Sequence, residues 1–319
     1  MDYYISMNIN CDILAIIIGY VDKRSVMVLY GTSRKFKKVV IDDVKFLFDL
    51  DKKVPKNKEV YYKYSITLNN LNNLQNFSLV NNLTHLSLGD SFNQSVDELP
   101  LGLKYLSLGN AFNQSVDNLP SGLKYLSLGD SFNQSVNNLP SGLTHLSLGD
   151  SFNKYINKLP SGLTHLSLGD SFNKSIDKLP LNLLELYLGL IFDKTINNLP
   201  KSLRKMHFSP GSYFNNSVDK LPSGLTHLIL GYNFMKSINC LPNGILHLSL
   251  GWKYGYHMTS RKIEQKLPDN IEVLSVGEHI DLNIFTNLHH HLINRRLVIK
   301  SSYSRVRINC FGWKNVNIL

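Results

Sequence analysis

Cysteine is scarce in this chain, and its placement excludes two common ways of stabilising a fold. The 319 residues contain only three cysteines, Cys11, Cys240 and Cys310. Because their number is odd and their spacing is wide, the sequence predicts neither a disulfide framework nor a structural zinc site. We therefore expect an intracellular, cytoplasmic protein in a reducing compartment, which would be the host cytoplasm if the gene is viral.

Long apolar runs are also missing. The run from Ile13 to Ile18 is too short to span a bilayer. Asp2 and Asp12 precede it, and no small-residue cleavage site follows, so it does not have the pattern of a signal peptide. We expect no membrane partner.

Charge of one sign is not concentrated anywhere. The net charge of +10 is of a kind that can indicate nucleic-acid binding. However, lysines such as Lys104, Lys124 and Lys154 are scattered, and no run of five or six basic residues occurs. The sequence therefore predicts no nucleic-acid partner.

Catalytic motifs are absent as well. The chain has no phosphate-binding glycine loop and no Gly-x-Ser-x-Gly elbow. We predict no catalytic residue, no metal and no cofactor, and hence a protein that is not an enzyme.

What the chain does contain is a repeat with a period of 20 residues. The dipeptide Leu-Pro recurs at this spacing from Leu99 to Leu199, and returns three times after small insertions. Such a period predicts a solenoid, which offers a long surface rather than a deep cleft. We assign the solenoid to residues 83–277, with about nine or ten coils.

Each unit predicts one short strand followed by a turn and an irregular return. In a typical unit, residues 125–128 alternate between polar and apolar, which is typical of a strand with one buried face. Gly129 and Asp130 supply the turn, and Phe132 and Val136 return to the core. Stacked units would pair these strands in a parallel ladder.

The pattern Leu-x-x-Leu-x-Leu with Leu-Pro at the boundary resembles a leucine-rich repeat. Phe-Asn follows the strand, as at Phe132-Asn133, and this combination resembles the FNIP repeat, a relative of the leucine-rich repeat. The resemblance weakens at Phe192-Asp193, at Met206 and Phe208, and beyond Trp252, where residues 254–266 look like an insertion. Asparagines such as Asn93, Asn113 and Asn133 are expected to form a hydrogen-bonded ladder on buried backbone groups.

The outward strand positions are the predicted target-binding surface, because rings beside small serines are enriched at protein interfaces. The first outward position of each strand is occupied by His85, Tyr105, Tyr125, His145, His165, Glu185, Lys205, His227 and His247. The second outward position is mostly serine, with Tyr187, His207 and Ile229 as departures.

One alternative for this surface is a cation shared by stacked His145 and His165. We do not favour it, because no carboxylate or thiol is expected beside the two rings. A surface sensitive to pH is a second alternative, since histidine titrates near neutrality.

Residues 1–50 do not follow the repeat and predict three short helices. Apolar residues fall near helical spacing, and a third helix is expected to open at Ser33 and to include Phe36, Val39 and Val40. This stretch resembles an F-box, with Asp22 at a joint. It departs from that family at two places. Ile9-Asn10 stands where the family usually has Leu-Pro, and Phe36 stands where the family commonly has Trp. The residues expected to bind an adaptor are Ile9, Ile13, Leu14, Ile17, Ile18, Val21, Val26 and Leu29.

The two flanks of the array complete the expected α+β organisation. Residues 51–82 are assigned to a linker with degenerate first coils, including Ile66-Thr67-Leu68. Residues 278–319 are assigned to a C-terminal cap. Three adjacent histidines, 289–291, cannot all face one ion, so we predict no metal site there.

The two resemblances together imply the substrate-recognition subunit of an SCF-type (cullin–RING) ubiquitin ligase. Its F-box would bind a Skp-type adaptor and hence a cullin, and its solenoid would bind an unknown target protein. Two alternatives stay open: the N-terminal helices are only a cap on an interaction module, or the protein inhibits or hijacks the ligase machinery. A cysteine-dependent ligase is not expected, because residues 278–319 leave no room for a domain around Cys310.

Overall fold

The computed structural model describes residues 84–277, 280–293 and 297–301, together with three short strand segments nearer the N-terminus. These are β1 (Val40–Ile41), β2 (Val44–Leu47) and β3 (Ser65–Leu68). The predicted adaptor-binding residues lie outside the described residues. Val40 was expected in a helix but lies in β1, so that prediction is wrong at this residue. The β-branched side chains of Val40, Ile41 and Val44 favour a strand.

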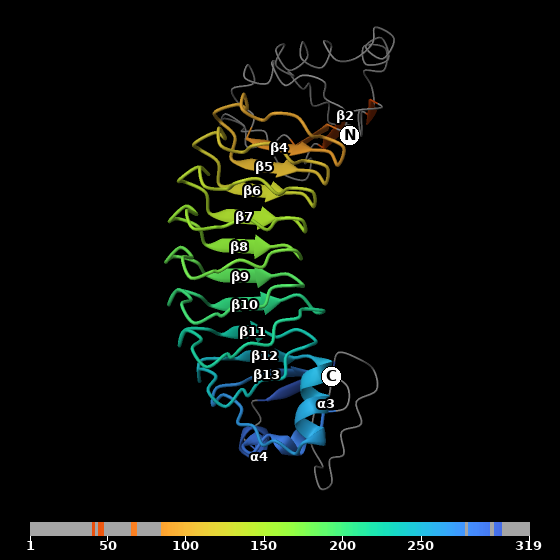
Figure 1. Ribbon diagram of the computed structural model, residues 1–319, viewed down its shortest axis with the longest axis vertical. Helices are drawn as coiled ribbons and strands as arrows, with labels where there is room; N and C mark the ends of the chain where they lie inside the picture. Colours follow the sequence, from red (N-terminus) through yellow and green to blue (C-terminus); the bar gives the residue numbers. More distant parts are fainter. Residues whose placement is uncertain are drawn as a thin grey trace, which may run out of the picture.

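The described strands form a single sheet of fourteen strands in sequence order, which appears as one long column in Figure 1. The pairs β1–β2 and β2–β3 are antiparallel, and every later pair is parallel. The later strands are β4 (His85–Leu88), β5 (Tyr105–Leu108), β6 (Tyr125–Leu128), β7 (His145–Leu148), β8 (His165–Leu168), β9 (Glu185–Leu188), β10 (Lys205–Phe208), β11 (His227–Ile229), β12 (His247–Leu250), β13 (Val273–Val276) and β14 (Val298–Ser301).

The regular solenoid comprises about eight coils within the described residues. Strands β4 to β12 begin 20 or 22 residues apart, and each pairs with the next so that equivalent residues lie side by side. This array is slightly shorter than the nine or ten coils expected. The sheet continues beyond it, because β3, predicted at residues 66–68, pairs with β4, and β13 and β14 extend the other end.

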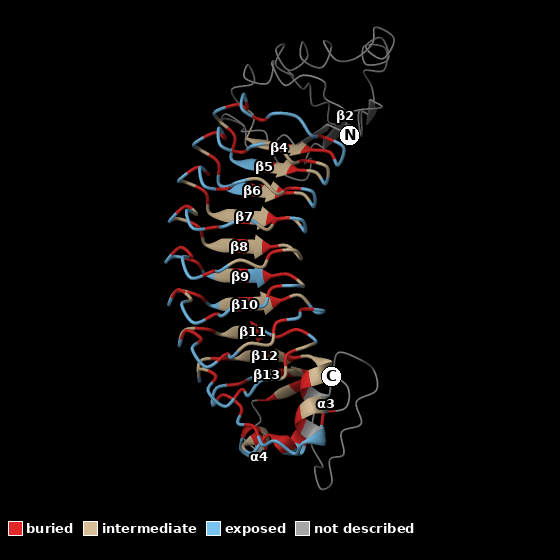
Figure 2. Ribbon diagram, in the orientation of Figure 1, coloured by how far each residue is buried: buried red, intermediate tan, exposed pale blue. Residues whose placement is uncertain are grey.

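The alternation in each strand sets its buried face, as the repeat predicts. In β6, Leu126 and Leu128 are buried, whereas Tyr125 and Ser127 are not. The other strands of the array bury the equivalent residues. Figure 2 shows buried and exposed segments at similar places in successive coils. Because a single coil buries few side chains, its stability depends on the coils stacked on either side.

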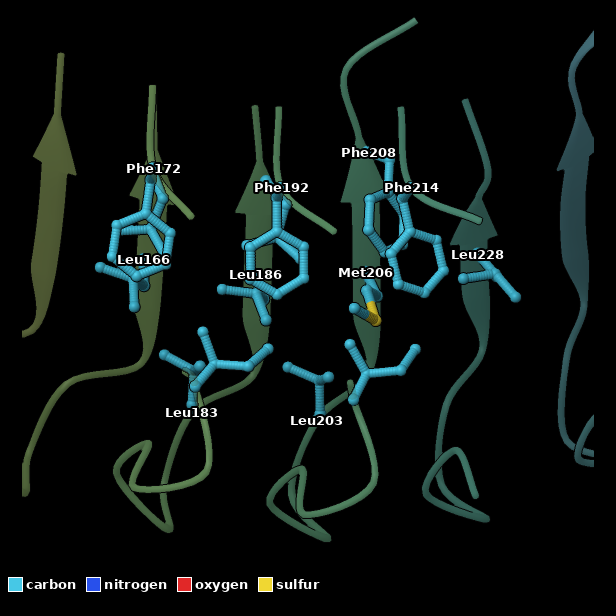
Figure 3. Close-up of a cluster of buried hydrophobic side chains, with 14 of the residues drawn as sticks. Leu166, Phe172, Leu183, Leu186, Phe192, Leu203, Met206, Phe208, Phe214 and Leu228 are labelled. Atoms are coloured by element: carbon cyan, nitrogen blue, oxygen red, sulfur yellow. The ribbon is translucent and has the colours of Figure 1, made fainter. Parts of the chain in front are cut away.

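A column of stacked phenylalanines fills the core behind the strands. The rings of Phe112 and Phe132 are 6.1 Å apart between centroids and inclined by 5°. Phe192 and Phe214 continue the stack across the coil that has two extra residues, at 6.3 Å. Figure 3 shows this region, where Met206 and Phe208 also point inward and are buried although the repeat pattern weakens there.

The coil between β12 and β13 is enlarged and contains helix α3 (Trp252–Ser260). It was expected only as an insertion. Tyr254 takes the place of the phenylalanine in the core stack, 6.0 Å from the ring of Phe234. Its hydroxyl donates to Oε1 of Gln265, a buried side chain that also accepts the backbone N–H of Ile238. The core column therefore continues through the insertion.

The last described elements are the 3-10 helix η2 (Leu282–Ile284), α4 (Leu288–Ile293) and β14. The three adjacent histidines lie on α4, where His291 is buried and within 3.1 Å of the Asn287 amide. No helix in the described part of the chain is long and apolar enough to span a membrane.

An asparagine ladder joins the irregular returns of successive coils. Each side-chain oxygen accepts the backbone N–H of the equivalent residue in the next coil, at 2.8–3.2 Å. The predicted ladder is confirmed, and Asp193 continues it where the pattern weakens. These groups are half-buried or exposed, so the expectation of buried backbone groups is wrong. The ladder residues are Asn93, Asn113, Asn133, Asn153, Asn173, Asp193 and Asn215.

Candidate protein-interaction face

The residues predicted to bind a target occupy one face of the sheet. Parallel pairing in register places the first outward position of each strand beside that of the next, as in His145 beside His165. The nine side chains at the first outward position, together with Tyr187 and His207, are exposed or half-buried. Tyr105, Tyr125 and Tyr187 are 36%, 42% and 38% exposed, which is high for large aromatic groups. We call this set, with the second outward positions, the outward face.

Five rings follow one another along the first half of this face, and neighbouring rings are stacked except for Tyr105 and Tyr125, which are tilted by 34°. They belong to His85, Tyr105, Tyr125, His145 and His165, on strands β4 to β8. The centroids of Tyr125 and His145 are 4.0 Å apart, as are those of His145 and His165. In the stacked pairs each ring covers the flat side of the next, so these pairs present ring edges to solvent. Those edges are hydroxyl groups and imidazole nitrogens rather than apolar surface.

A threonine before each of several histidines fixes the orientation of the imidazole. The Thr144 hydroxyl lies 2.9 Å from Nδ1 of His145 and also donates to the backbone carbonyl of Lys124 at 3.0 Å. Thr164 makes the same two contacts with His165 and Thr144. Thr226 does so with His227 and Arg204.

The centre of the face departs from the repeat and carries a carboxylate. Glu185 Oε1 lies 2.7 Å from Nζ of Lys205 and 3.8 Å from Nε2 of His165. Glu185 Oε2 accepts the hydroxyl of Tyr187 at 3.2 Å. The expectation that no carboxylate lies beside the two stacked histidines is therefore wrong, because parallel pairing places Glu185 on the strand next to His165.

Beyond this centre the rings resume. Tyr187 and His207 make an edge-to-face contact at 4.7 Å, and His227 stacks on His247 at 4.3 Å. Ile229 adds an exposed apolar side chain on β11. The face thus has an aromatic first half, a charged centre and a second histidine pair.

Burial lowers the pKa of several of these histidines. For His145, burial is the main cause and the neighbouring His165 adds to it. For His227, burial and then His247 and Lys205 lower the pKa. The hydrogen bond from Lys205 lowers the pKa of Glu185, and burial with the nearby Glu185 raises that of Tyr187. Near neutral pH the face therefore carries neutral imidazoles at His145, His207 and His227 together with the ionised carboxylate of Glu185.

The geometry does not favour a metal shared by His145 and His165. Their rings are inclined by only 9°, so their in-plane nitrogen lone pairs run parallel and do not converge on one ion. Among the residues that the structure describes, no three His, Cys, Asp or Glu side chains are grouped so as to hold a metal ion.

The repeat itself decides the family. The model of the FNIP Repeat matches residues 70–111, 95–131, 112–150, 152–191 and 214–253, which together make up about half of the chain. The chain belongs to the FNIP repeat family. No curated protein sequence matches it.

Among solved structures, the FNIP array is similar to CroV588, described as a novel circular LRR protein. The two share 37% identity with a TM-score of 0.57 over 70% of this chain. The match spans only about a third of CroV588, at 34% of its length. YopM from Yersinia enterocolitica WA-314 aligns over 76% of this chain and 59% of its own, at 21% identity and a TM-score of 0.37, which is too low to support an argument.

The FNIP array is thus a solenoid of the leucine-rich-repeat type, suited to protein–protein interaction. Sequence reasoning placed the outward positions but missed the threonine contacts and the role of Glu185. A signal for the threonine contacts was present in the sequence, because the dipeptide Thr-His recurs at Thr144-His145, Thr164-His165 and Thr226-His227.

Proposed function

We propose that this FNIP protein is a non-catalytic substrate-recognition subunit of an SCF-type ubiquitin ligase. Its N-terminal segment binds a Skp-type adaptor and thereby a cullin, and its outward face binds the target protein. Such a subunit acts in the cytoplasm by holding a lysine of the target near the charged ubiquitin-conjugating enzyme, which raises the effective concentration of the reactants.

One observation supports the part of the proposal that concerns target binding, namely the continuous outward face. It crosses nine successive strands with exposed or half-buried rings and a charged centre, and its residues are held in register by the sheet. Tyrosine is enriched at protein interfaces, and its few rotatable bonds limit the entropy lost on binding. A surface of this length suits a macromolecular partner better than a small substrate.

The adaptor-binding half is supported by the F-box resemblance of residues 1–50. In that resemblance, the apolar side chains of Ile13, Leu14, Ile17 and Ile18 would be buried against the adaptor. Burying each such side chain contributes about 1.5–3 kcal/mol, so loss of two or more would abolish measurable binding.

A reconstituted binding measurement tests this half. The purified full chain is titrated with a purified Skp-type adaptor by calorimetry, beside a variant with Ile13→Ser and Ile17→Ser. The matched control is Tyr155→Ser, which alters an exposed residue of the array. Binding by the wild type and control but not by the double variant supports the proposal. No binding by a folded wild type would overturn it and leave an interaction module with a helical cap.

A further inference from the structure

The irregular return of each coil, which runs from the core phenylalanine to the Leu-Pro, changes the sign of its charge along the array. The returns that follow strands β4, β5 and β6 contain three carboxylates and no basic side chain. The returns that follow β7 to β11 contain seven lysines and three aspartates. We call these lysines the lysine stripe: Lys154, Lys158, Lys174, Lys178, Lys194, Lys220 and Lys236.

The fold brings together lysines that are scattered in the sequence and aligns them in two columns. Lys154, Lys174 and Lys194 each follow a residue of the asparagine ladder, whose hydrogen bonds hold successive returns in register. Lys158 and Lys178 occupy a second position, four residues further along each return. Because neighbouring parallel strands lie about 4.8 Å apart, the backbone positions of a column recur at about that distance.

The second column shows that its lysines are not used to join the coils. Each asparagine of this column, such as Asn198, donates at 3.1 Å to an aspartate of the preceding coil, here Asp177. Where the column has a lysine, as at Lys178, the corresponding residue of the preceding coil is an asparagine, Asn157. The other two lysines of the column have the same kind of counterpart, Asn137 for Lys158 and Asn197 for Lys220.

The ammonium groups of the stripe are available to a partner. Six of the seven lysine side chains are exposed, and Lys174 is half-buried with its Nζ 5.5 Å from the ring centre of Tyr155. Among the described residues, none of the seven ammonium groups forms an ion pair or a hydrogen bond. Like charges held in register repel one another, and an anionic partner would relieve that repulsion.

The side chains of the stripe suit carboxylates better than the phosphates of a nucleic acid. The stripe has no arginine, which is the side chain that binds phosphate through two parallel hydrogen bonds. Tyr155 is the only tyrosine or tryptophan in these five returns, so no series of rings offers stacking to bases. Asp177, Asp193 and Asp219 would repel a continuous phosphate backbone, whereas a peptide can place neutral side chains opposite them.

We propose that the lysine stripe binds an acidic segment of a protein partner, whose glutamate or aspartate carboxylates lie along the two columns. From Lys154 to Lys236 the stripe crosses four coil steps, or about 19 Å, which is the length of about six extended residues. The stripe is formed by the returns and the outward face by the strands. This inference therefore does not depend on the proposed role of the outward face or of the adaptor-binding residues.

Fluorescence anisotropy with the full chain tests the proposal. The three labelled probes are a six-fold repeat of Ser-Glu, a six-fold repeat of Ser-Gln and a single strand of six thymidines. In about 50 mM NaCl we expect the Ser-Glu peptide to bind at least about tenfold more tightly than the Ser-Gln peptide, and to lose about fivefold in about 200 mM NaCl. Tighter binding of the thymidine strand than of the Ser-Glu peptide would overturn the choice of partner.

The first three returns of the array supply a matched variant of the stripe. Lys154→Gln, Lys174→Gln and Lys194→Gln introduce the glutamine that the equivalent position has in those returns, so the triple variant should fold. We expect its affinity for the Ser-Glu peptide to fall about tenfold. Circular dichroism verifies that the variant is folded before its affinity is compared.

A control variant separates the stripe from the overall charge of the chain. Lys104→Gln, Lys124→Gln and Lys201→Gln remove the same three charges from outside the returns and should cost about twofold or less. Tyr125→Ala with Tyr187→Ala, in the outward face, should leave the affinity for the Ser-Glu peptide unchanged. Equal losses from the two triple variants, or no preference of the folded wild type for the Ser-Glu peptide, would overturn the proposal.

Discussion

The side-chain oxygen of Asn113 accepts the backbone N–H of Asn133, its counterpart in the next coil, at 2.9 Å. Asn133 does the same for Asn153 at 3.0 Å. Each asparagine therefore satisfies a backbone donor that the irregular return of the next coil leaves outside the sheet. This relationship explains why the motif needs an oxygen acceptor after each phenylalanine, and why Asp193 can replace asparagine.

Removing one rung of this ladder should destabilise the array. Asn133→Ala leaves the Asn153 backbone N–H without its acceptor, and we expect a loss of about 1–2 kcal/mol in the free energy of unfolding. Asn133→Asp keeps the oxygen and should cost much less. Urea unfolding followed by circular dichroism measures both, and equal losses would argue against an acceptor role.

The glycine that follows strands β5 to β9 is required by close approach between coils. A Cβ on Gly149 would collide with the backbone carbonyl of Gly129, whereas one on Gly162 would meet only carbonyl oxygens at 3.7 Å. We therefore expect Gly149→Ala to cost about 3 kcal/mol and Gly162→Ala to be nearly neutral. Thermal unfolding of the two variants compares them, and a tolerated Gly149→Ala would contradict the packing described.

The repeat predicts most of the array, because each position in it has one physical role. The alternation at residues 125–128 gives the buried and outward faces, and Leu-Pro and Phe-Asn mark where the chain returns. These signals lie within each repeat unit, so they can be recognised without knowing which residues lie beside them in the neighbouring coils. The sheet, its register and the phenylalanine stack follow from repeating that unit.

The details that depend on neighbouring coils were harder to predict. That Glu185 lies beside His165 follows only when residues 20 apart are aligned as partners. Helix α3 and the hydrogen bond between Tyr254 and Gln265 occur where the period is lost, so the repeat gives no guide there. Strand β1 occurs where spacing suggested a helix, because β-branched residues compete with that pattern.

Acid should weaken the array in a defined range of pH. Burial lowers the pKa of His145, His207 and His227 below the ordinary value of 6.5 in the folded protein. The unfolded chain therefore takes up protons first, so stability is lost as pH falls below about 6.5 and levels off below the folded pKa values. The pKa of Glu185 is lowered from 4.5, so its contribution is lost only in stronger acid.

Urea unfolding at pH 7.5 and 5.5 measures this effect. The wild type should be less stable at pH 5.5, and His145→Phe should reduce the difference between the two values. A wild type that is equally stable at both would contradict the lowered pKa values of the half-buried imidazoles of His145, His207 and His227.

The buried amide of Gln265 should matter more than the tyrosine hydroxyl that contacts it. Tyr254→Phe removes one donor from Gln265 Oε1 and should cost about 1 kcal/mol. Gln265→Leu also leaves the Ile238 backbone N–H unsatisfied and should cost about 2–3 kcal/mol. Calorimetric unfolding of both variants provides the ranking, and the reverse order would show that Gln265 does not anchor the enlarged coil.

The most direct test of a protein that joins a ligase adaptor to a target is a comparative affinity capture from cells. The wild type is compared with a variant carrying serine at Ile13, Leu14, Ile17 and Ile18, and with an outward-face variant carrying Tyr125→Ala and Tyr187→Ala. We predict that the first variant loses a Skp-type adaptor and a cullin but keeps the remaining partners. The second should keep adaptor and cullin and lose those partners. Capture of neither adaptor nor cullin by the folded wild type would contradict the account.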